Sequence, residues 1–409
     1  MSIYTDAQEI IHSALEACLP DQAVRRALEG KELGSGRVFL VALGKAAWQM
    51  ARCAAELLGP RLEQGVVVTK HGHSQGDIPR CQVFEGGHPV PDEGSFRGTR
   101  AAMELVQDLA PQDTVVLLVS GGGSALFERP LIPAEELAQL TSALLACGAD
   151  IVEMNTVRKR LSAVKGGRFA QLCAPAQVYS IVLSDILGDP LDMIASGPAY
   201  PDSSTCADAR RIAEQYQLPL SGQARALLDQ ETPKELDNVE TVITGSVREL
   251  CSAAAAACQR LGYETHILTD QLCCQAREAG SFLASIARTH GQEGRSLAFL
   301  AGGETVVLLT GKGLGGRNQE LALSAAEGIS GMENALIFSL GSDGTDGPTD
   351  AAGGIVDGQT RGKLAQAGLT IHQVLADNDA YHALEKVDGL IRTGPTGTNV
   401  NDVAVVLLK

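Results

Sequence analysis

The sequence predicts an α/β fold in two domains, and four observations support this prediction. Short apolar runs alternate with helical patterns along all 409 residues, which is typical of α/β proteins. This length exceeds that of a usual single domain. Hydrophobic residues make up 44% of the chain and charged residues 20%, which suits a globular protein with a large core. A linker-like stretch at residues 230–236 divides the chain into expected domains 1–235 and 236–409.

Charge and composition exclude several classes of protein. The net charge of -16 argues against a nucleic-acid surface, which needs clustered Lys and Arg. The first 18 residues form an amphipathic helical pattern without the basic start of a signal peptide, and no apolar run reaches the about 20 residues of a membrane span. The ten cysteines lack metal-ligand spacing, which favours free thiols in a reducing cytoplasm. We expect a cytoplasmic protein without nucleic-acid or membrane partners; a homodimer is compatible with the sequence.

The elements follow from the spacing of apolar residues. Apolar positions at helical spacing predict helices, and short apolar runs rich in β-branched residues predict strands. The expected helices are 6–19, 21–28, 48–58, 95–109, 133–147, 207–227 with a break near Pro219, 247–261, 276–289 and one opening near 317. The expected strands are 37–43, 65–70, 115–119, 177–183, 238–243, 263–268, 296–301 and 335–340.

The run VVLLVSGGGS, residues 115–124, joins a fully apolar strand to a glycine turn. Three glycines let the backbone approach a ligand closely, and the N–H groups of such a turn favour an anion, above all a phosphate. A flexible tight turn is the plain alternative. We expect ligand binding by the five residues that form the turn: Ser120, Gly121, Gly122, Gly123 and Ser124.

Lys45 lies between a strand and a helix in the sequence VALGKAAW. The unit lacks the full GxxxxGK[ST] spacing of a phosphate loop. Lys45 nevertheless follows the carboxyl end of a strand, where ligands bind in open α/β sheets, although a solvated lysine at a helix start is the alternative. His71, His73 and His88 follow nearby strands, and a substrate loop or a structural role is favoured for them over a metal site.

A basic cluster stands out in this acidic chain: Arg158, Lys159, Arg160, Lys165 and Arg168. Such a run is usually a solvated helix face. The preceding Asn155 and the glycines that follow Lys165 make an anion-facing role an equal alternative. We expect Asn155 and Lys165 to contact substrate or nucleotide.

Asp185 and Asp189 follow the strand at 177–183 in the loop SDILGDP. Two carboxylates in a Gly/Pro loop suit a metal–phosphate site or a base, and turn and cap chemistry is the alternative. Pro190 biases Asp189 toward an extended backbone and stiffens the loop. We expect Asp189 to act as the base, with Asp185 structural or facing the metal.

Three further loops, in the C-terminal half, combine glycines with charged or polar residues after an apolar run. Gly303 and Glu304 follow an apolar strand, and the sequence GKGLGGRNQE places four glycines before a helix start, where an anion is favoured over a mobile hairpin. The acids of GSDGTDGPTD lack the closing Glu of a calcium loop. Expected ligand-binding and catalytic residues here are Gly303, Glu304, Gly315, Gly316, Arg317 and Asn318, with Asp343 and Asp346 as metal ligands.

Ten stretches resemble, in order along nearly the whole chain, the glycerate 2-kinase family, whose C-terminal part is called the MOFRL region. They are VALGKAA, GGHPVPDEGS, LVSGGGSAL, NTVRKRLSAVKGGR, LSDILGDPLDMIASGP, AGGETVV, GLGGRNQE, GSDGTDGPTDAAGG, DNDAYHAL and TGPTGTNVNDV. The resemblance implies transfer of the γ-phosphate of ATP to the 2-hydroxyl of D-glycerate with Mg²⁺. It also implies a Rossmann-like three-layer α/β/α N-terminal domain, a smaller α/β C-terminal domain, and an active site in the cleft between them.

The residue chemistry favours a kinase over two alternatives. Phosphoryl transfer needs positive charge, metal-binding acids and a group that orients the hydroxyl. Lys45 and Arg317 would stabilise charge, and the aspartates named above would supply the rest. An NAD(P)H-dependent hydroxypyruvate reductase, the alternative that relatives' names suggest, should carry GxGxxG after a strand, which neither glycine loop fits. A non-catalytic sugar-acid binding protein would not need so many acids at strand ends.

Overall fold

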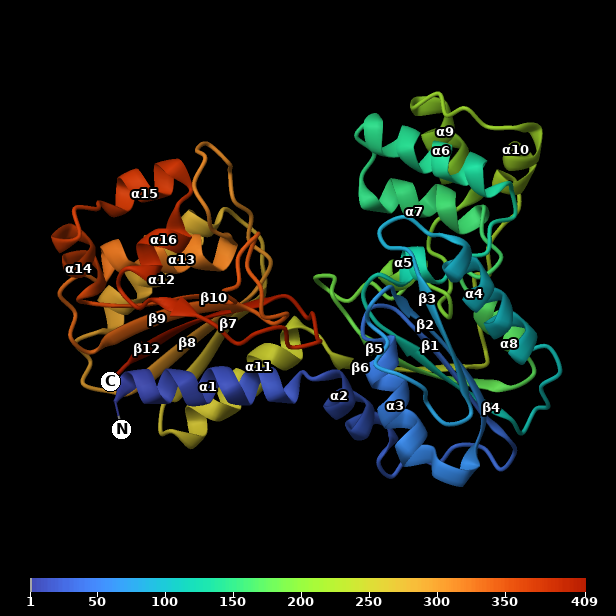
Figure 1. The fold of residues 1–409 in the computed structure, drawn as a ribbon, viewed down its shortest axis with the longest axis horizontal. Helices are drawn as coiled ribbons and strands as arrows, with labels where there is room; N and C mark the ends of the chain where they lie inside the picture. Colours follow the sequence, from blue (N-terminus) through green and yellow to red (C-terminus); the bar gives the residue numbers. More distant parts are fainter. Residues whose placement is uncertain (1) are drawn as a thin grey trace. The chain divides into compact units, whose positions relative to one another are not determined.

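The computed structural model describes residues 2–409, which divide into two compact units (Figure 1). The N-terminal unit comprises residues 24–183 and 189–244. The C-terminal unit comprises residues 2–23, 184–188 and 245–409. Helix α2 (Pro20–Leu28) spans the boundary between the two units at residues 23 and 24. Each unit is an α/β structure around its own sheet, as the sequence predicts.

This division differs from the expected ranges 1–235 and 236–409 in two respects. Helix α1 (Ile3–Ala17) belongs to the C-terminal unit, because its apolar stripe around Ile10 and Ala14 is buried on that unit's sheet. Strand β6 (Val239–Gly245) instead pairs into the sheet of the N-terminal unit. Both assignments rest on contacts between residues far apart in the sequence, which local patterns do not reveal.

The N-terminal sheet has the strand order β3-β2-β1-β4-β5-β6. The pairs β2–β3, β1–β2, β1–β4 and β4–β5 are parallel. Every residue of β1 and β4 is buried, which agrees with their uninterrupted apolar runs. The order is that of doubly wound dinucleotide-binding folds. The strands are β1 (Val38–Leu43), β2 (Leu62–Lys70), β3 (Cys81–Gly86), β4 (Thr114–Val119), β5 (Gln177–Leu183) and β6.

Helices lie on both sides of this sheet, with α3 on one side and α4 and α8 on the other (Figure 1). A separate helical layer of α6, α7, α9 and α10 packs around Leu137, Leu140 and Ile212. The expected break near Pro219 is confirmed, since α9 and α10 are separate helices. The helices are α3 (Ala47–Leu58), α4 (Glu93–Leu105), α5 (Gly123–Leu126), α6 (Ala134–Ala146), α7 (Ile151–Arg160), α8 (Arg168–Cys173), α9 (Cys206–Gln215) and α10 (Gly222–Leu228), with single 3₁₀ turns at Gly59–Arg61 and Ile194–Ser196.

The C-terminal sheet is mixed, with the order β11-β10-β9-β12-β8-β7. Strands β7 and β8 are parallel, whereas β12 runs antiparallel to both β8 and β9. The start of β12 therefore lies beside the carboxyl ends of β8 and β9, with Asp402 opposite Gly303 and Gly341. The strands are β7 (Glu264–Leu272), β8 (Leu297–Gly303), β9 (Ala335–Gly341), β10 (Gly353–Asp357), β11 (Leu390–Ile391) and β12 (Asp402–Leu408).

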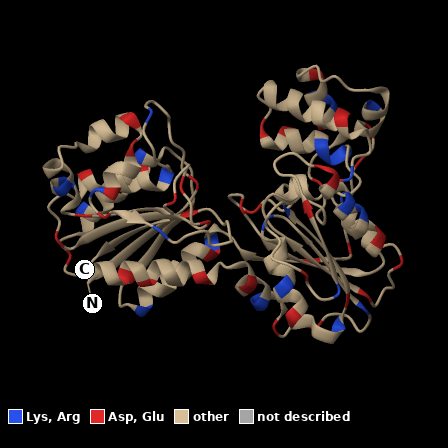
Figure 2. Cartoon of the chain, in the orientation of Figure 1, with Lys and Arg blue, Asp and Glu red and all other residues tan. Residues whose placement is uncertain are grey.

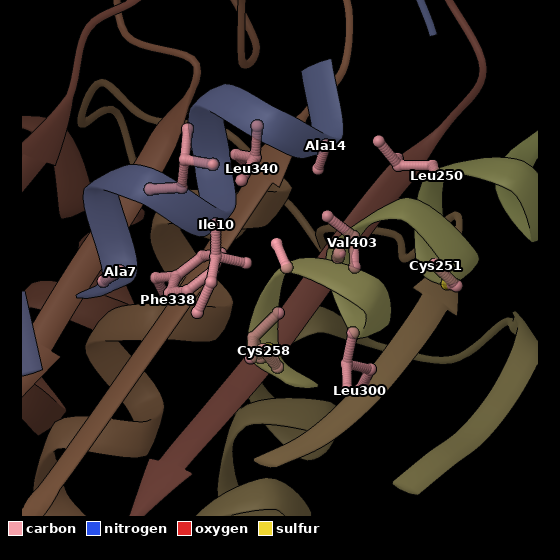
Figure 3. Packing of buried hydrophobic residues seen from close by; sticks show 14 of the residues in the cluster. Ala7, Ile10, Ala14, Leu250, Cys251, Cys258, Leu300, Phe338, Leu340 and Val403 are labelled. Carbon is pink, nitrogen blue, oxygen red and sulfur yellow. The ribbon is translucent and has the colours of Figure 1, made fainter. Parts of the chain in front are cut away.

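Each face of the C-terminal sheet carries a hydrophobic core. Helices α1 and α11 cover one face, where Ile10 and Cys258 lie with Phe338, Leu340 and Val403 of the strands (Figure 3). Tyr263 Oη and Lys409 Nζ each donate to Asp6 Oδ2 at 2.7 Å and join the two chain ends to this layer. The helices of the unit are α1, α11 (Val247–Arg260), α12 (Ala276–His290), α13 (Arg317–Gly328), α14 (Thr360–Gln366), α15 (Ile371–Asp377) and α16 (Ala380–Glu385), of which α12 and α13 pack on the opposite face.

The charged surface is mixed in sign, and the cysteines are thiols rather than disulfides, as the sequence predicts. Lys and Arg are interspersed with Asp and Glu over both units (Figure 2). All ten cysteines are free thiols, and six of them are buried. Within residues 2–409, no helix is both long and apolar enough to cross a membrane.

Candidate active site

The loops after β1 and β4 meet where the strand order of the N-terminal sheet reverses. Beyond β1 the chain continues toward β2 and β3, and beyond β4 toward β5 and β6, so the two loops flank the topological switch point at which open α/β sheets bind ligands. Lys45 N donates to Gly121 O at 2.9 Å, and Ala46 N donates to Ser120 Oγ at 3.2 Å. We call Lys45, His88 and residues 120–124 the switch-point site.

The backbone of Lys45 is fixed while its ammonium group is free. Its carbonyl oxygen accepts from Thr69 Oγ1 at 3.3 Å and lies 3.1 Å from His73 Nδ1. Within residues 2–409 the ammonium makes no hydrogen bond or ion pair, and the side chain is only half-buried. Burial, with the nearby charges of Lys45 and Lys70, lowers the pKa of His88. A free cation at this position can stabilise an anionic ligand.

The glycine turn brings its backbone close to two side chains. A Cβ at Gly122, where φ is +84°, would lie 3.0 Å from His88 Cδ2 and 3.2 Å from Lys45 Cγ. In the described part of the chain, no acceptor pairs with the N–H of Gly122 or Gly123. The turn can therefore offer these donors to an anion beside Lys45. Ser120 is 3% exposed and ties β1 to β4, so it is part of the framework.

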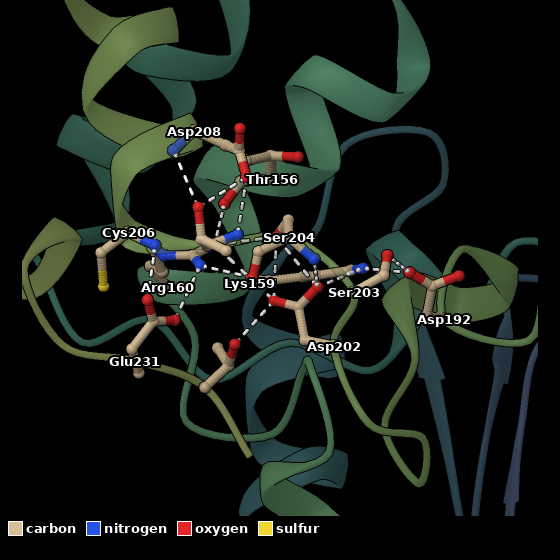
Figure 4. A network of polar contacts seen from close by, with 12 residues as sticks. Thr156, Lys159, Arg160, Asp192, Asp202, Ser203, Ser204, Cys206, Asp208 and Glu231 are labelled. Atoms are coloured by element: carbon tan, nitrogen blue, oxygen red, sulfur yellow. Dashed lines mark hydrogen bonds and ion pairs between the residues drawn. The ribbon is translucent and has the colours of Figure 1, made fainter. Parts of the chain in front are cut away.

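The basic residues of α7 do not form a solvated face. Lys159 is buried and donates to Asp192 and Asp202, and Arg160 donates to Ser204 and lies 3.4 Å from Glu231 (Figure 4). The fully solvated interpretation of the cluster is thus wrong for these two side chains. They fix the connection between β5 and β6 to the helical layer.

Lys165 and Asn155, both expected to contact ligand, are also buried. The Lys165 ammonium donates to Ser124 O at 2.8 Å and to Phe127 O at 2.9 Å, and lies 3.4 Å from Glu128. Burial lowers its pKa to about 8. Asn155 accepts from Ser196 Oγ at 2.9 Å. In this structure both side chains lie behind the switch-point site, where Lys165 contacts Ser124 and Asn155 contacts Ser196.

The two aspartates of the loop after β5 belong to different units. Asp185 lies in residues 184–188 of the C-terminal unit, and Asp189 begins the second segment of the N-terminal unit. Asp189 has a φ of +52°, so the extended backbone expected before Pro190 is wrong, and its buried Oδ1 has no hydrogen-bond partner within residues 2–409. A strained residue with an unpaired buried carboxylate oxygen is typical of functional sites.

The C-terminal unit has a cavity of about 770 Å³ lined by the expected loops. Arg317, the first residue of α13, donates through Nε and Nη2 to the two carboxylate oxygens of Asp402, at 2.5 and 3.0 Å. Its Nη1 donates to Glu304 Oε1 at 2.9 Å. Burial alone would lower the pKa of Arg317, but the hydrogen bonds and charge of Asp402 outweigh it and raise that pKa. We call Glu304, Arg317, Asp346 and Asp402 the α13 site.

Asp346 caps the N-terminus of α13. Its carboxylate oxygens accept from Asn318 N at 3.1 Å and Gln319 N at 2.9 Å. Glycine is required at the N-cap, because a Cβ on Gly316 would lie 2.3 Å from Asp346 Cγ. Burial raises the pKa of Asp346 to about 6. The two N–H donors act in the opposite direction, and the nearby negative charge of Asp402 raises the pKa further. Asn318 is buried and accepts from Ser339 Oγ, so it supports the helix start.

The glycine-rich loop before α13 is held by residues 377–379. Asn378 Oδ1 accepts from Thr310 N at 2.8 Å and Gly311 N at 2.9 Å, and its Nδ2 donates to Glu320 Oε2. The loop is therefore joined by hydrogen bonds to residues 377–379, and it presents Gly315 and Gly316 to the cavity along with Glu304. Gly303 ends β8 directly before Glu304.

The expected metal ligands fit Mg²⁺ unequally. Both oxygens of Asp346 are engaged in capping, which does not suit a metal ligand. Asp343 lines the cavity and uses only Oδ1, which accepts from Thr345 N at 2.9 Å. Among residues 2–409, no three His, Cys, Asp or Glu side chains are grouped to hold a metal ion. Mg²⁺ in kinases is often held by one or two carboxylates together with the substrate phosphates, and Asp343 can supply one such carboxylate.

Three residues of these sites were not expected to be functional from the sequence: Ser196, Asn378 and Asp402. Ser196 ends a 3₁₀ turn, Asn378 lies between α15 and α16, and Asp402 begins β12, but the local pattern does not show what these side chains contact. Asp402 had a detectable signal, since it begins an apolar run directly after a Gly/Asn-rich loop.

Comparison with known proteins places the chain in a family. A model described as "Domain of unknown function (DUF4147)" matches residues 6–229, and the MOFRL family matches residues 297–402. A protein of Thermotoga maritima named D-glycerate 2-kinase is 52% identical over 98% of this chain and 97% of its own length. This chain belongs to the glycerate 2-kinase family.

Other members agree in length and fold. A glycerate 2-kinase of Pyrococcus horikoshii is 41% identical and covers 100% of this chain and 98% of itself. The present chain matches the crystal structure of a Thermotoga maritima glycerate kinase with a TM-score of 0.96. The two sequences are 52% identical, and the match covers 99% of both chains. A protein of Agrobacterium vitis that is 38% identical over 98% of this chain carries the name putative hydroxypyruvate reductase. The predicted family and two-unit α/β architecture are thus confirmed.

Proposed function

We propose that this chain is a D-glycerate 2-kinase that transfers the γ-phosphoryl group of ATP to the 2-hydroxyl of D-glycerate. The observation that carries the proposal is the full-length likeness to a protein named D-glycerate 2-kinase. The switch-point site supports it, because Lys45 and unpaired N–H groups suit an anionic substrate.

Four candidate residues have a role in this proposal. Lys45 and Arg317 stabilise the negative charge of the transferred phosphoryl group. Asp189 accepts the proton of the substrate hydroxyl, for which its unpaired buried oxygen is suited. Mg²⁺ would be held by Asp343 together with the phosphates, where it would neutralise their charge. The cytoplasmic location and the homodimer stay predictions.

The test is a coupled assay of ATP consumption with D-glycerate, with identification of the phosphorylated carbon. We expect 2-phosphoglycerate. A 3-phosphoglycerate product would contradict the proposal. Oxidation of NAD(P)H with hydroxypyruvate, in the absence of ATP turnover, would favour the reductase that the name of the Agrobacterium vitis relative suggests.

The base assignment has its own test in the pair Asp189→Asn and Asp185→Asn. If Asp189 is the base, its variant loses turnover on the order of 10²-fold or more and keeps its affinity for Mg·ATP. A metal ligand would instead raise the Mg²⁺ requirement and weaken nucleotide binding together. Normal turnover by Asp189→Asn would move the search for the base to Asp343 and Asp346.

A further inference from the structure

Three polar side chains form a chain of hydrogen bonds behind the switch-point site. Ser124 Oγ lies 2.8 Å from Ser196 Oγ, and Ser196 Oγ donates to Asn155 Oδ1 at 2.9 Å. Ser196 and Asn155 are 0% and 1% exposed, whereas Ser124 is half-exposed at the turn. Only the Ser124 end of this chain can reach a ligand.

The donor and acceptor of each hydrogen bond in this network follow from Asn155, its buried end. The Asn155 amide is oriented by its Nδ2, which donates to Met193 Sδ at 3.7 Å. Its Oδ1 therefore faces Ser196 and needs a donor, because a buried carbonyl oxygen without one costs about 1–3 kcal/mol. A serine hydroxyl has one hydrogen, and Ser196 uses it on Asn155. Ser124 must then donate its own hydrogen to Ser196.

The backbone prevents the two serines from rearranging. The carbonyl oxygen of Ser124 accepts from Lys165 Nζ at 2.8 Å and Arg158 Nη2 at 3.0 Å, and the carbonyl of Ser196 accepts from Gly166 N at 3.0 Å. Ser196 has a φ of +60° and Ala195 one of +52°. Non-glycine residues keep such strained conformations only where the surroundings over-determine them.

Ser124 consequently presents oxygen lone pairs, and no hydrogen, to a ligand. Ionised phosphate and carboxylate oxygens are acceptors only and cannot pair with such a group, whereas an alcohol can donate to it. Resting on the function proposed above, we propose that Ser124, oriented by Ser196 and Asn155, accepts a hydrogen bond from a hydroxyl group of the acceptor substrate.

The first test separates the two substrates by steady-state kinetics. In Ser124→Ala and Ser196→Gly, kcat/KM for D-glycerate should fall on the order of tenfold, with KM for Mg·ATP unchanged within about twofold. Glycine suits the φ of residue 196, so the backbone of that variant is not strained, and its cost is the lost donor to Asn155 Oδ1. Ser285→Ala on α12, a matched hydroxyl loss outside both sites, should behave as wild type. A raised KM for Mg·ATP with unchanged glycerate kinetics would overturn the proposal.

The second test asks whether Ser196 acts through Ser124. If it does, the double variant should match Ser124→Ala alone, since the positioning residue has nothing left to orient. Additive losses would instead give Ser196 an independent structural role and overturn its positioning role.

The third test is calorimetric and does not depend on turnover. D-Lactate lacks the 3-hydroxyl of glycerate and 3-hydroxypropionate lacks the 2-hydroxyl, so Ser124→Ala should weaken binding of only one of them. Equal weakening of both, or of neither, would overturn the hydroxyl contact. Wild-type protein that binds glycerate without phosphorylating it would end the proposed kinase function and leave this comparison intact.

Discussion

Lys45 and Arg317 are both cations beside a helix start, one in each unit, and their surroundings differ. Lys45 is anchored through its backbone, and its ammonium has no ion-pair partner in residues 2–409. Arg317 is bound to both oxygens of Asp402 and to Glu304. The first charge is available to a ligand at once, whereas the second is already neutralised and acts partly as a structural group.

The difference teaches that the same substitution should have separable effects in the two units. Removal of a free charge changes ligand binding and catalysis alone. Removal of a paired charge also leaves buried carboxylates without their partner, which destabilises the fold. Turnover and unfolding free energy, measured together, can therefore tell the two kinds of cation apart.

Arg317→Ala should have the largest combined effect. We expect turnover to fall on the order of 10²-fold or more, because a transition-state donor is lost. The unfolding free energy should fall on the order of 2 kcal/mol, because Asp402, whose side chain is 8% exposed, loses both hydrogen bonds. Steady-state kinetics and urea unfolding measure the two losses. Unchanged stability would show that the Asp402 pair contributes nothing to the fold.

Lys45→Ala should lose a similar factor in turnover, on the order of 10²-fold, with little change in stability. Because the ammonium has no partner that the substitution would leave unpaired, the unfolding free energy should stay within about 0.5 kcal/mol of wild type. Lys45→Arg should recover part of the rate, and Lys386→Ala, on the surface after α16, serves as the control for a lost lysine. Near-wild-type rates in Lys45→Ala would make this an ordinary surface charge.

Asp346→Asn should change how stability depends on pH. The folded pKa of Asp346, about 6, lies above its ordinary value of 3.8, so the native state holds the proton more tightly than the unfolded chain does. This group therefore lowers stability as pH rises from about 4 to about 6, by at most about 1.4 kcal/mol per pH unit. The variant lacks this slope. Urea unfolding of both proteins at pH 4.5, 5.5 and 6.5 measures it, and a pH-independent difference between them would contradict the assignment.

Glu304→Gln should have the smallest effect. The Glu304 side chain is 46% exposed, so its ion pair with Arg317 is screened and should contribute at most about 0.5 kcal/mol. Turnover should stay within a few-fold of wild type, because Asp402 still orients the guanidinium group. A loss as large as that of Arg317→Ala would instead give Glu304 a direct role in the reaction.

Local sequence patterns predict most of the elements and the loops that carry the sites. The GK and SGGGS loops both follow fully apolar strands, and the structure joins them at the switch point. Strand β12 is absent from the expected elements, although six of its seven buried residues, 403–408, form a continuous apolar run. Its place between β8 and β9 depends on antiparallel pairing that the run itself does not encode.

The roles of charged side chains are harder to predict, because they depend on burial and distant partners. Lys159 and Lys165 have the sequence character of a solvated run, and the structure buries both. Asp346 lies in a loop whose acids suggest a metal, yet it caps a helix that begins 29 residues earlier in the chain, at Arg317. A sequence shows which groups are present, whereas their partners come from the folded chain.

The position of α1 and β12 has a consequence for synthesis. The C-terminal unit contains both the first described helix and the last strand, and β12 separates β8 from β9 in its sheet. The N-terminal unit can complete its sheet once residue 245 has emerged from the ribosome. Until β12 emerges, β8 and β9 keep open edges and the apolar stripe of α1 has no finished surface to cover. The second unit can close only after β12 has emerged.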